Sequence, residues 1–411
     1  MTTIAVLVGR LISLASRLLG MGAGATWPGE VALWLNPHIL SELARNLKKG
    51  VIIVAGTNGK TTSSLMIQTI VENNELTVVS NASGANLENG IVSALINNSH
   101  ADYGVFEIDE NSLPVVLKSV QPKIIVLLNL FRDQLDRYGE VDVIAEKWEK
   151  ALEDTKATII ANADDPLIAH LGQQHKTLFF GIEDKTKYQK TAEHATDSTF
   201  CLNCGGRLQY DGVFFSHMGI WKCPACAERR PKPDVIEALS PIAGLYNTYN
   251  ALAAASVAKV LKITADLTGF HPAFGRQEQI GNTKIFLSKN PAGFNQSLRT
   301  ALELGAKEML LVLNDRVPDG RDVSWIWDVD FEMIPKSVSV RVSGDRVYDL
   351  ALRLKYAGIN AKIFENLGKA LRTTNQLFVL PTYSAMLDVR NLILGNKIPL
   401  TTKTRPRKSC Q

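Results

Sequence analysis

The chain has 411 residues, of which 45 are basic and 41 acidic, so its formal net charge is only +4. Hydrophobic residues make up 45% and charged residues 21%, which is the balance of an ordinary globular protein. These values exclude a disordered, collagen-like or disulfide-framework chain, and so small a charge gives no reason to expect nucleic acid as a partner. The length predicts two or three domains of roughly 150 residues each.

Residues 4–19 read IAVLVGRLISLASRLL and predict an amphipathic helix with Arg10, Ser13 and Arg17 on one face. The two arginines interrupt the apolar run and no basic cluster precedes it, so we do not interpret it as a signal peptide. We expect this helix to pack against the first domain, with weak contact to a membrane surface as the alternative. The tail at 397–411 has five basic residues and no acidic one. A solvated tail is expected there, with attraction to anionic lipid as the alternative.

Strand-like and helix-like patterns alternate along two parts of the chain. An apolar, β-branched run at 51–55 ends at Gly56 and is typical of a buried strand. The other predicted strands are 76–79, 103–108, 124–129 and 157–161 in the first part, and 284–287, 308–313, 338–342, 361–364 and 376–380 in the second. Strands that alternate with helices predict an α/β fold with doubly wound parallel sheets.

The domain organisation follows from changes in composition along the chain. We expect a helical lead-in over 1–50, a central domain over 51–270 and a smaller α/β domain over 271–411. The boundary falls in the stretch 268–275, which contains glycine and proline. Residues 196–234 have cysteine pairs and glycines in place of the alternating pattern, so we interpret them as an insertion in the central domain.

The strongest enzymatic signal lies between the first predicted strand and the helix that follows it. The glycines allow the backbone to wrap an anion, and the start of the helix presents free N–H groups to phosphates. Lys60 would neutralise phosphate charge, and the hydroxyl of Thr61 would bind Mg²⁺. The general phosphate-loop pattern asks for glycine at position 54, where this chain has Val54. The residues expected at the phosphates are Gly56, Thr57, Asn58, Gly59, Lys60, Thr61 and Thr62.

The short form G-T-N-G-K-T-T resembles the phosphate loop of the Mur ligase superfamily, ATP-dependent amide-bond-forming enzymes of peptidoglycan synthesis. Further segments match the motifs of that superfamily in the same order, namely 106–110, 129–139, 162–166, 244–250 and 275–276. The resemblance implies that Glu107 holds Mg²⁺ together with Thr61, that Asn250 contacts adenine and that Arg276 reaches the ATP phosphates. It also implies a Mur ligase-type P-loop central domain followed by a smaller Rossmann-like C-terminal domain.

One position departs from the superfamily pattern, and this departure affects what we expect of a second position. Gln134 stands where the superfamily usually has a metal-binding histidine, so we do not expect a second Mg²⁺ there. Lys147 matches a lysine that many members carbamoylate, and with Gln134 in place of the histidine we do not assume that modification.

Four cysteines form two C-x-x-C pairs separated by 18 residues: Cys201, Cys204, Cys223 and Cys226. This spacing is typical of tetrahedral zinc sites with four thiolate ligands. Because all four coordination positions would be filled by protein, the predicted zinc site is structural rather than catalytic. Redox and iron–sulfur alternatives are less favoured because nothing nearby indicates electron transfer. Ordinary Mur ligases lack this zinc-ribbon insertion.

Other segments resemble one branch of the superfamily, the MurT subfamily of Mur-ligase-like subunits of lipid II isoglutaminyl synthase. They are residues 18–29, 288–295 and 314–328. Only 50 residues precede the first predicted strand, so we expect no UDP-binding domain. The resemblance implies that ATP phosphorylates the α-carboxylate of D-glutamate in the lipid II stem peptide, and that ammonia then displaces phosphate to leave D-isoglutamine. Lys60, Arg276 and Lys289 would offset the charge of the transferring phosphoryl group.

Ammonia for this reaction is scarce at neutral pH, and the chain shows no glutaminase nucleophile: it has no G-x-C-x-G elbow. We therefore expect a separate class I glutaminase subunit that resembles GatD. Asp345, near a predicted helix start, is most simply a helix cap or dipole partner. Asp349 is expected on a solvated helix face. Its functional alternative is a third catalytic role, in which Asp349 orients the histidine of the partner glutaminase.

Two competing interpretations remain at this stage. A Mur or folylpolyglutamate-type ligase would add an amino acid in place of ammonia, and its ATP turnover would depend on that amino acid. A zinc-ribbon interaction protein without catalysis would be expected to have lost Lys60, Thr61 or Glu107, and all three are present. The favoured prediction is a cytoplasmic carbon–nitrogen ligase that uses ATP and meets lipid II at the inner face of the membrane.

Overall fold

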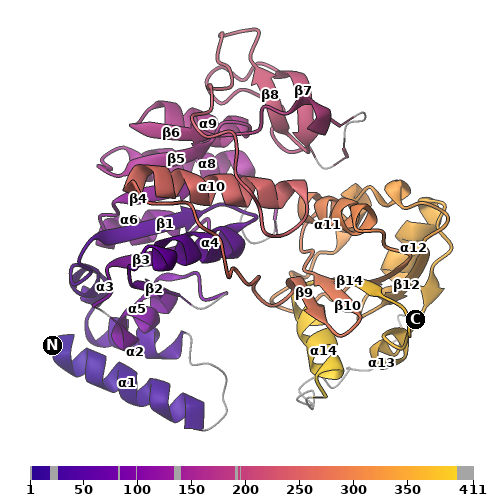
Figure 1. Cartoon of the computed structure of the whole chain (residues 1–411), viewed down its shortest axis with the longest axis horizontal. Coiled ribbons are helices and arrows are strands. Elements are labelled where there is room, and N and C mark those ends of the chain that lie inside the picture. The colour runs from indigo at the N-terminus through magenta and orange to yellow at the C-terminus, as the bar shows by residue number, and fades with distance from the viewer. Residues whose placement is uncertain are drawn as a thin grey trace, which may run out of the picture.

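The computed structural model describes residues 2–18, 26–81, 84–98, 100–133, 140–189, 193–194 and 196–395. Two six-stranded sheets lie side by side (Figure 1). The first contains β1 (Gly50–Ala55), β2 (Val78–Ser80), β3 (Tyr103–Ile108), β4 (Ile124–Leu127), β5 (Thr158–Asn162) and β6 (Thr177–Phe180). Its order is β2-β3-β1-β4-β5-β6, and all neighbouring strands are parallel.

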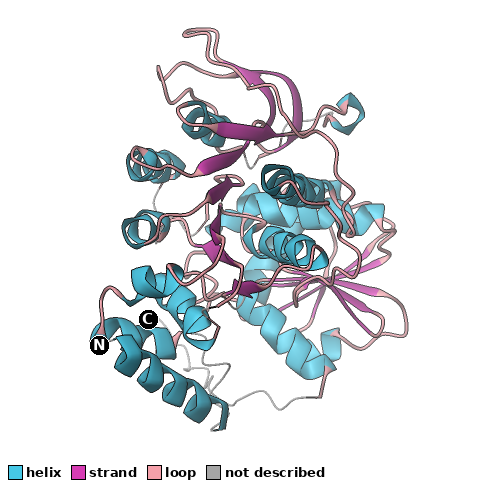
Figure 2. Cartoon of the chain, turned by 60° about the vertical axis from the view of Figure 1, so that its left-hand side comes forward, coloured by secondary structure: helices cyan, strands magenta, loops and turns pink. Residues whose placement is uncertain are grey.

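Strand β1 shows why this sheet needs helices on both faces. Val51, Ile53 and Ala55 point into one core, and Ile52 and Val54 point into the other, as the two-residue period of a strand requires. The first core is covered by α3 (Ile39–Ala44), α5 (Glu88–Asn97), α6 (Leu113–Ser119), α8 (Val141–Leu152) and α9 (Pro166–Gln173). The second is covered by α4 (Lys60–Asn73) and α10 (Leu245–Leu261), and Figure 2 shows helices on either side of the strands.

Helices α1 (Thr2–Leu18) and α2 (Trp27–Leu35) extend the first core beyond α5. The helix predicted at 4–19 is present and packs against the first domain. Ser13, one of the residues predicted to share a face, is 4% exposed and faces the protein, whereas Leu11 is 66% exposed. None of the helices in the described part of the chain has the length and apolar character needed to span a membrane.

The second sheet contains β9 (Arg276–Ile280), β10 (Thr283–Phe286), β11 (Glu308–Val312), β12 (Ser339–Ser343), β13 (Lys362–Ile363) and β14 (Leu377–Pro381). Its order is β13-β12-β11-β14-β10-β9. One face packs on α11 (Pro291–Glu303) and α12 (Val347–Tyr356), and the other on α13 (Leu367–Ala370) and α14 (Tyr383–Ile393). The predicted α/β class is confirmed. One edge departs from the parallel pattern, because β9 pairs antiparallel with β10.

Between β6 and α10 the chain leaves the first sheet and forms a hairpin of β7 (Gln209–Phe215) and β8 (Met218–Lys222), at the top of Figure 1. The tip of this hairpin is anchored in the central domain. His217 is fully buried, and its Nε2 lies 3.2 Å from Oδ2 of Asp165, the residue that caps α9. Its ring packs 4.8 Å from the ring of Phe131, centroid to centroid. The hairpin is therefore held by a buried polar contact as well as by apolar packing.

The contact between His217 and Asp165 makes the stability of the chain depend on pH. Burial alone favours the neutral imidazole, but the Asp165 carboxylate outweighs it and raises the pKa of His217 above its ordinary value of 6.5. The folded chain therefore keeps a proton that the unfolded chain releases above pH 6.5. The stabilisation is complete below that pH and is lost as the pH rises through the folded pKa. We expect the free energy of unfolding, measured in urea at a series of pH values above 6.5, to fall more steeply with rising pH for the wild type than for His217→Gln. Equal slopes would contradict this assignment.

Candidate active site

The loop between β1 and α4 can be built only with glycine at two positions. Gly56 has φ +146° and Gly59 has φ +89°, in the region that favours glycine. A Cβ at Gly56 would lie 2.9 Å from Cβ of Leu128, and one at Gly59 would lie 2.2 Å from Oδ1 of Asn250. Among the described residues no side chain caps α4. Its first N–H groups, with the positive end of the helix dipole, therefore face the loop as an anion site.

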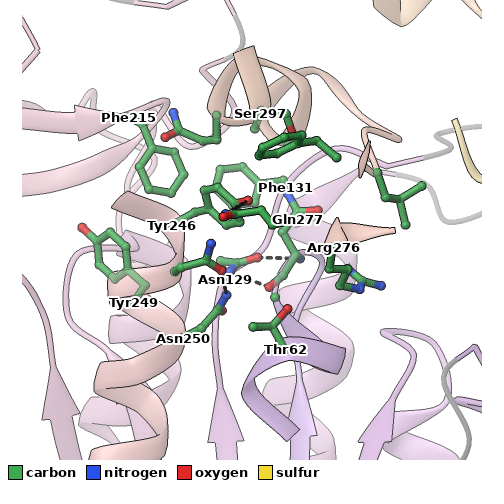
Figure 3. A pocket seen from close by; sticks show the side chains of 18 of the residues that line it. Thr62, Asn129, Phe131, Phe215, Tyr246, Tyr249, Asn250, Arg276, Gln277 and Ser297 are labelled. Carbon is green, nitrogen blue, oxygen red and sulfur yellow. Dashed lines mark hydrogen bonds between the residues drawn. The ribbon is translucent and has the colours of Figure 1, made fainter. Parts of the chain in front are cut away.

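Asn129, which follows β4, stabilises this loop conformation through hydrogen bonds. Its Oδ1 accepts from the backbone N–H of Asn58 at 2.8 Å, and its Nδ2 donates to the Asn58 carbonyl at 3.0 Å (Figure 3). The N–H of Thr57 donates to the carbonyl of Asn129 at 2.9 Å. The loop is thus preorganised by a residue about 70 positions away, which the sequence motif contained but to which we had given no role.

Two lysines and two carboxylates alternate beneath the loop. Nζ of Lys60 lies 3.1 Å from Oε2 of Glu110, and Nζ of Lys289, which follows β10, pairs with Oδ2 of Asp133. Burial favours the protonated acid at Glu110, yet Lys60 and Lys289 hold its pKa below the ordinary value. Burial also favours the neutral amine at Lys289, yet Asp133 and Glu110 raise its pKa. The amine of Lys289 is therefore held in its charged form where phosphate would enter.

The expected Mg²⁺ ligands lie at the carboxyl end of β3 and the start of α4. Glu107 is 3% exposed; its Oε1 accepts from the N–H of Gly84 at 3.0 Å. Its Oε2 is buried with no hydrogen-bond partner in the described part of the chain, and the same holds for Oδ1 of Asp133. Buried, unsatisfied carboxylate oxygens are the donors that Mg²⁺ prefers, so these residues fit the ion.

Arg276 reaches this region from β9 in the second sheet. Its Nη2 donates to Oγ1 of Thr61 at 3.1 Å. Burial lowers the pKa of Arg276, and the charge of Glu107 acts in the opposite direction. The guanidinium thus contacts Thr61 and feels the charge of Glu107, the two residues predicted to share a metal ion.

A cavity opens beside the loop, between α4, α10 and the start of α11 (Figure 3). Five predicted residues line it, namely Asn58, Gly59, Thr62, Asn250 and Arg276. Asn250 is oriented by its neighbours, because its Oδ1 accepts from Oγ of Ser63 at 3.1 Å and its Nδ2 donates to Oδ1 of Asn247 at 3.0 Å. Lys60, Thr61 and Glu107 are not part of the lining.

Aromatic side chains form much of the cavity wall, and the insertion contributes to it. Phe131, Tyr246 and Tyr249 line the cavity together with Phe215 and Met218 from the tip of the hairpin. A flat apolar wall next to an anion-binding loop suits a ligand with an aromatic base and phosphates. The sequence carried no signal for Phe215 or Met218, because their position depends on how the insertion folds back.

The insertion and both sheets meet around this cavity. The side chains of Asn58 and Asn290 exchange hydrogen bonds of 3.3 and 3.0 Å across the junction. Glu193 is 6% exposed; its Oε1 lies 3.0 Å from Nη2 of Arg299 on α11. Its Oε2 accepts from the N–H of Ser216 at the hairpin tip at 3.2 Å. These contacts hold the start of α11 against the phosphate loop.

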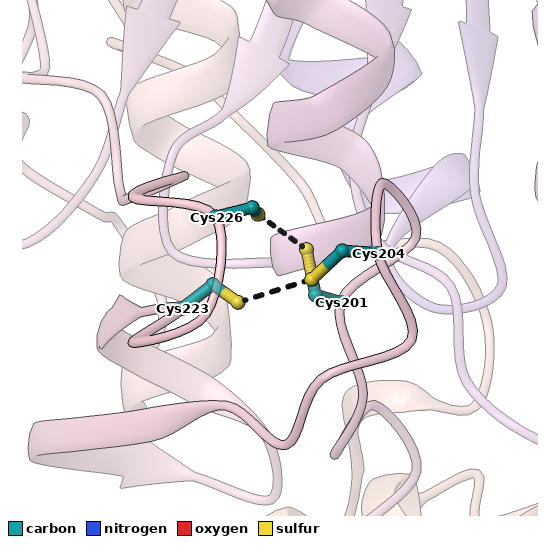
Figure 4. Close-up of side chains that lie close together, drawn as sticks. All are labelled: Cys201, Cys204, Cys223 and Cys226. Carbon is teal, nitrogen blue, oxygen red and sulfur yellow. Dashed lines mark hydrogen bonds between the residues drawn. The ribbon is translucent and has the colours of Figure 1, made fainter.

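The four cysteines gather at one end of the insertion (Figure 4). All four Sγ atoms lie within 4.8 Å of one another. The pair Cys201 and Cys226 is separated by 3.6 Å, and the pair Cys204 and Cys223 by 3.5 Å. A tetrahedral Zn²⁺ with Zn–S bonds of about 2.3 Å places its sulfurs about 3.8 Å apart, so the four thiols fit zinc.

Asp349 lies apart from this site, in the first turn of α12. Its carboxylate accepts from Nε and Nη2 of Arg346 at 2.7 and 3.0 Å, and its side chain is 43% exposed. Of the two roles expected for Asp345, helix cap and dipole partner, the cap is wrong. Arg346 is the N-cap residue, no side chain among the described residues caps α12, and Asp345 pairs with Nε of Arg316 at 2.8 Å.

Gln134 and Lys147 were also considered in the sequence analysis as possible metal-binding or carbamoylated positions. Gln134 lies outside the described residues. Lys147 is exposed on α8, and its Nζ donates to Oδ1 of Asn111 at 3.3 Å.

Comparison with known proteins agrees with these features. Residues 54–258 match the family of Mur ligase middle domains, and residues 287–386 match that of MurT ligase C-terminal domains. The lipid II isoglutaminyl synthase (glutamine-hydrolyzing) subunit MurT of Streptococcus pneumoniae (strain ATCC BAA-255 / R6) is 34% identical over 97% of this chain and 98% of its own. The subunit of the same name from Staphylococcus aureus (strain COL) is 34% identical over 87% of this chain and 89% of its own.

Solved structures show the same fold. A pseudomurein peptide ligase type C from Methanothermus fervidus has a TM-score of 0.67 at 23% identity and covers 85% of this chain and 79% of that one. A MurF ligase from Thermotoga maritima in complex with ADP has a TM-score of 0.60 at 18% identity and covers 89% of this chain and 83% of that one. The predicted resemblance is thus confirmed: the chain belongs to the MurT branch of the Mur ligase family.

Proposed function

We propose that this ligase of peptidoglycan synthesis amidates the α-carboxylate of D-glutamate in the lipid II stem peptide to D-isoglutamine, using ATP and ammonia from a separate glutaminase. Its MurT relatives are named as subunits of a glutamine-hydrolysing lipid II isoglutaminyl synthase. The observation that carries the proposal is that buried Lys60 and half-buried Lys289, each paired with a carboxylate, lie beside a glycine loop at the edge of an aromatic cavity.

ATP would bind with its base in the cavity and its phosphates on the loop. The adenine would lie against the aromatic wall within reach of Asn250, and the phosphates would accept from the N–H groups of the segment 56–62. Arg276 would contact the terminal phosphate from the second sheet. Thr61 and Glu107 would hold Mg²⁺, which supplies charge neutralisation at the phosphates when it is bound.

The chemistry needs an activated carboxylate, because a carboxylate ion is a poor electrophile. An oxygen of the substrate carboxylate attacks the γ-phosphorus of ATP, ADP leaves, and an acyl-phosphate forms. The lone pair of ammonia then attacks the carbonyl carbon, phosphate leaves, and the surplus proton passes to solvent. Lys60, Lys289 and Arg276 would stabilise the charge that moves onto the phosphoryl oxygens in the first step.

Ammonia would come from a class I glutaminase subunit that resembles GatD. The four cysteines of the described chain are gathered in one metal-type cluster, so none of them is placed as a glutaminase nucleophile. Asp349 is the residue that we propose to act with that partner. Arg346 fixes its carboxylate through two hydrogen bonds and leaves it partly exposed, so that it could orient the imidazole of a partner histidine.

Lys60 tests the phosphate site. We expect Lys60→Ala to lower ammonia-driven, ATP-dependent amidation of lipid II by about 100-fold or more, since the loss of one such charge costs about 3 kcal/mol of transition-state stabilisation. The measurement is mass spectrometry of lipid II, because amidation lowers its mass by about one unit. Lys307→Ala, at an exposed lysine, is the matched control. Near-normal turnover by folded Lys60→Ala protein would overturn the site, and turnover that needs an amino acid in place of ammonia would identify an amino-acid ligase.

Glu107 tests the Mg²⁺ site separately from the phosphate loop. Glu107→Ala should slow amidation to a similar extent, because it removes a buried carboxylate ligand. Excess Mg²⁺ should partly restore its rate but not that of Lys60→Ala. A rate that stays low and independent of Mg²⁺ concentration would argue against a metal role for Glu107.

The cysteine cluster is expected to bind one Zn²⁺ per chain as a structural ion. Because the binding energy of a closed site contributes to folding, Cys204→Ser should lower the melting temperature by several degrees and affect the rate per folded molecule much less. Cys410→Ser, at the cysteine that belongs to neither C-x-x-C pair, is the control. Metal analysis that finds no zinc in protein prepared without chelator would exclude this role.

Asp349 tests the contact with the partner. Asp349→Ala should lower glutamine-driven amidation by the complex by about tenfold or more and leave ammonia-driven amidation unchanged, because only the first uses the glutaminase. Asp345→Ala, four positions earlier and paired with Arg316, is the matched control. If both rates fall together, or neither falls, Asp349 has no such role.

A further inference from the structure

The outermost helix, α1, presents its large aliphatic side chains to solvent. Ile4, Leu7, Leu11 and Leu14 are 63%, 55%, 66% and 56% exposed. Their spacing of three and four residues places them along one side of the helix. Figure 1 shows that α1 lies at the edge of the molecule, with α2 and α5 on its inner side.

The opposite side of α1 is made of small residues and is packed closely. Ala5 and Ser13 are buried, and a Cβ at Gly9 would lie 2.7 Å from Cδ1 of Ile96. A surface helix ordinarily turns its large apolar residues inward and its small or polar ones outward. On α1 the fully buried residues are small and four large aliphatic side chains face solvent, so the side that these four form is a surface that the described chain does not cover.

Aromatic residues and positive charge accompany this surface. On the neighbouring helix α2, Trp27 is 70% and Trp34 is 83% exposed. Tryptophan combines an apolar ring with a polar N–H and is favoured where hydrocarbon meets water. The sequence of α1 contains Arg10 and Arg17 and no acidic residue, and the first 50 residues hold five basic and two acidic residues.

We propose that Ile4, Leu7, Leu11 and Leu14 of α1, with Trp27 and Trp34 of α2, form a membrane-docking surface that binds anionic lipid bilayers. Helix α1 lies in the plane of the interface, with its aliphatic side among the acyl chains. The charge selects this occupant: an anionic bilayer complements the excess of basic over acidic residues in the first 50 positions, whereas a second copy of the chain would bring like charges together.

The biological purpose of this surface rests on the proposed function. Lipid II carries its stem peptide on a membrane-embedded lipid, so a ligase held at the bilayer meets its substrate in two dimensions. The binding itself can be measured without any catalysis, which keeps the two proposals separable.

The test is co-sedimentation of the full chain with vesicles of phosphatidylcholine alone or with about 30% phosphatidylglycerol. We expect binding to the anionic vesicles that weakens as salt is added. Leu7→Gln combined with Leu11→Gln should weaken it about tenfold or more, because two apolar anchors are removed. Leu239→Gln with Val317→Gln, at side chains that are 93% and 74% exposed, is the matched control and should bind as the wild type does.

Three results would overturn the proposal. Equal binding by the two double variants would show that the surface is not involved, and loss of binding on removal of residues 396–411 alone would assign it to the basic tail. A change in oligomeric mass, or loss of the glutaminase partner, in the Leu7/Leu11 variant without a change in vesicle binding would identify a protein interface.

A second arm separates this proposal from the proposed function. The Leu7/Leu11 variant should amidate a water-soluble, short-chain lipid II analogue at the wild-type rate and amidate lipid II in anionic vesicles several-fold more slowly. If neither protein amidates the analogue, the proposed function fails while vesicle binding still decides the docking surface. If both substrates slow equally, the surface acts on folding or catalysis and the docking proposal fails.

Discussion

Four charges of alternating sign, three of them buried and the fourth, Lys289, half-buried, hold the active site together. Lys60 pairs with Glu110, and Lys289 pairs with Asp133, with the two pairs close enough to shift one another's pKa values. A charge left alone in such a place costs several kcal/mol, so each member requires the others. The four residues come from the phosphate loop, the end of β3, the segment after β4 and the segment after β10. The junction of the two sheets is therefore the place where the site can exist, and neither sheet provides it alone.

The sequence predicted those parts of the fold in which local pattern and burial agree. The run at 51–55 was predictable because a central parallel strand is apolar on both faces. Strand β9 reads Arg276-Gln-Glu-Gln-Ile280 and escaped prediction, because an edge strand takes its conformation from its pairing with β10 rather than from its own side chains. The hairpin β7–β8 and strand β6 were missed as well. The outward orientation of α1 could not be predicted, since periodicity shows that a helix has two faces but not which one the protein covers.

The residues of the candidate site also fall into two groups, those that local sequence predicts and those whose roles depend on tertiary contacts. Gly56, Gly59 and Lys60 lie within five consecutive residues, and their conformational and charge requirements can be seen in the sequence itself. Glu110 and Asn129 lie within segments that resembled known motifs, but their partners are set by tertiary contacts. The helix-cap role of Asp345 was assigned wrongly because helix-cap statistics consider only the local sequence, whereas its partner Arg316 follows another strand, β11.

The walls of the cavity come from the loop near Gly59, the hairpin tip near Phe215, helix α10 and the start of α11, so they are separated by as many as about 240 positions along the chain. Contacts of such long range form late, because the intervening chain must be ordered before they contribute. A nucleotide that binds there can recognise only molecules in which both sheets and the insertion are already assembled. Its binding energy therefore favours the complete assembly over every partly folded form, and occupancy of the cavity reports the integrity of the whole chain.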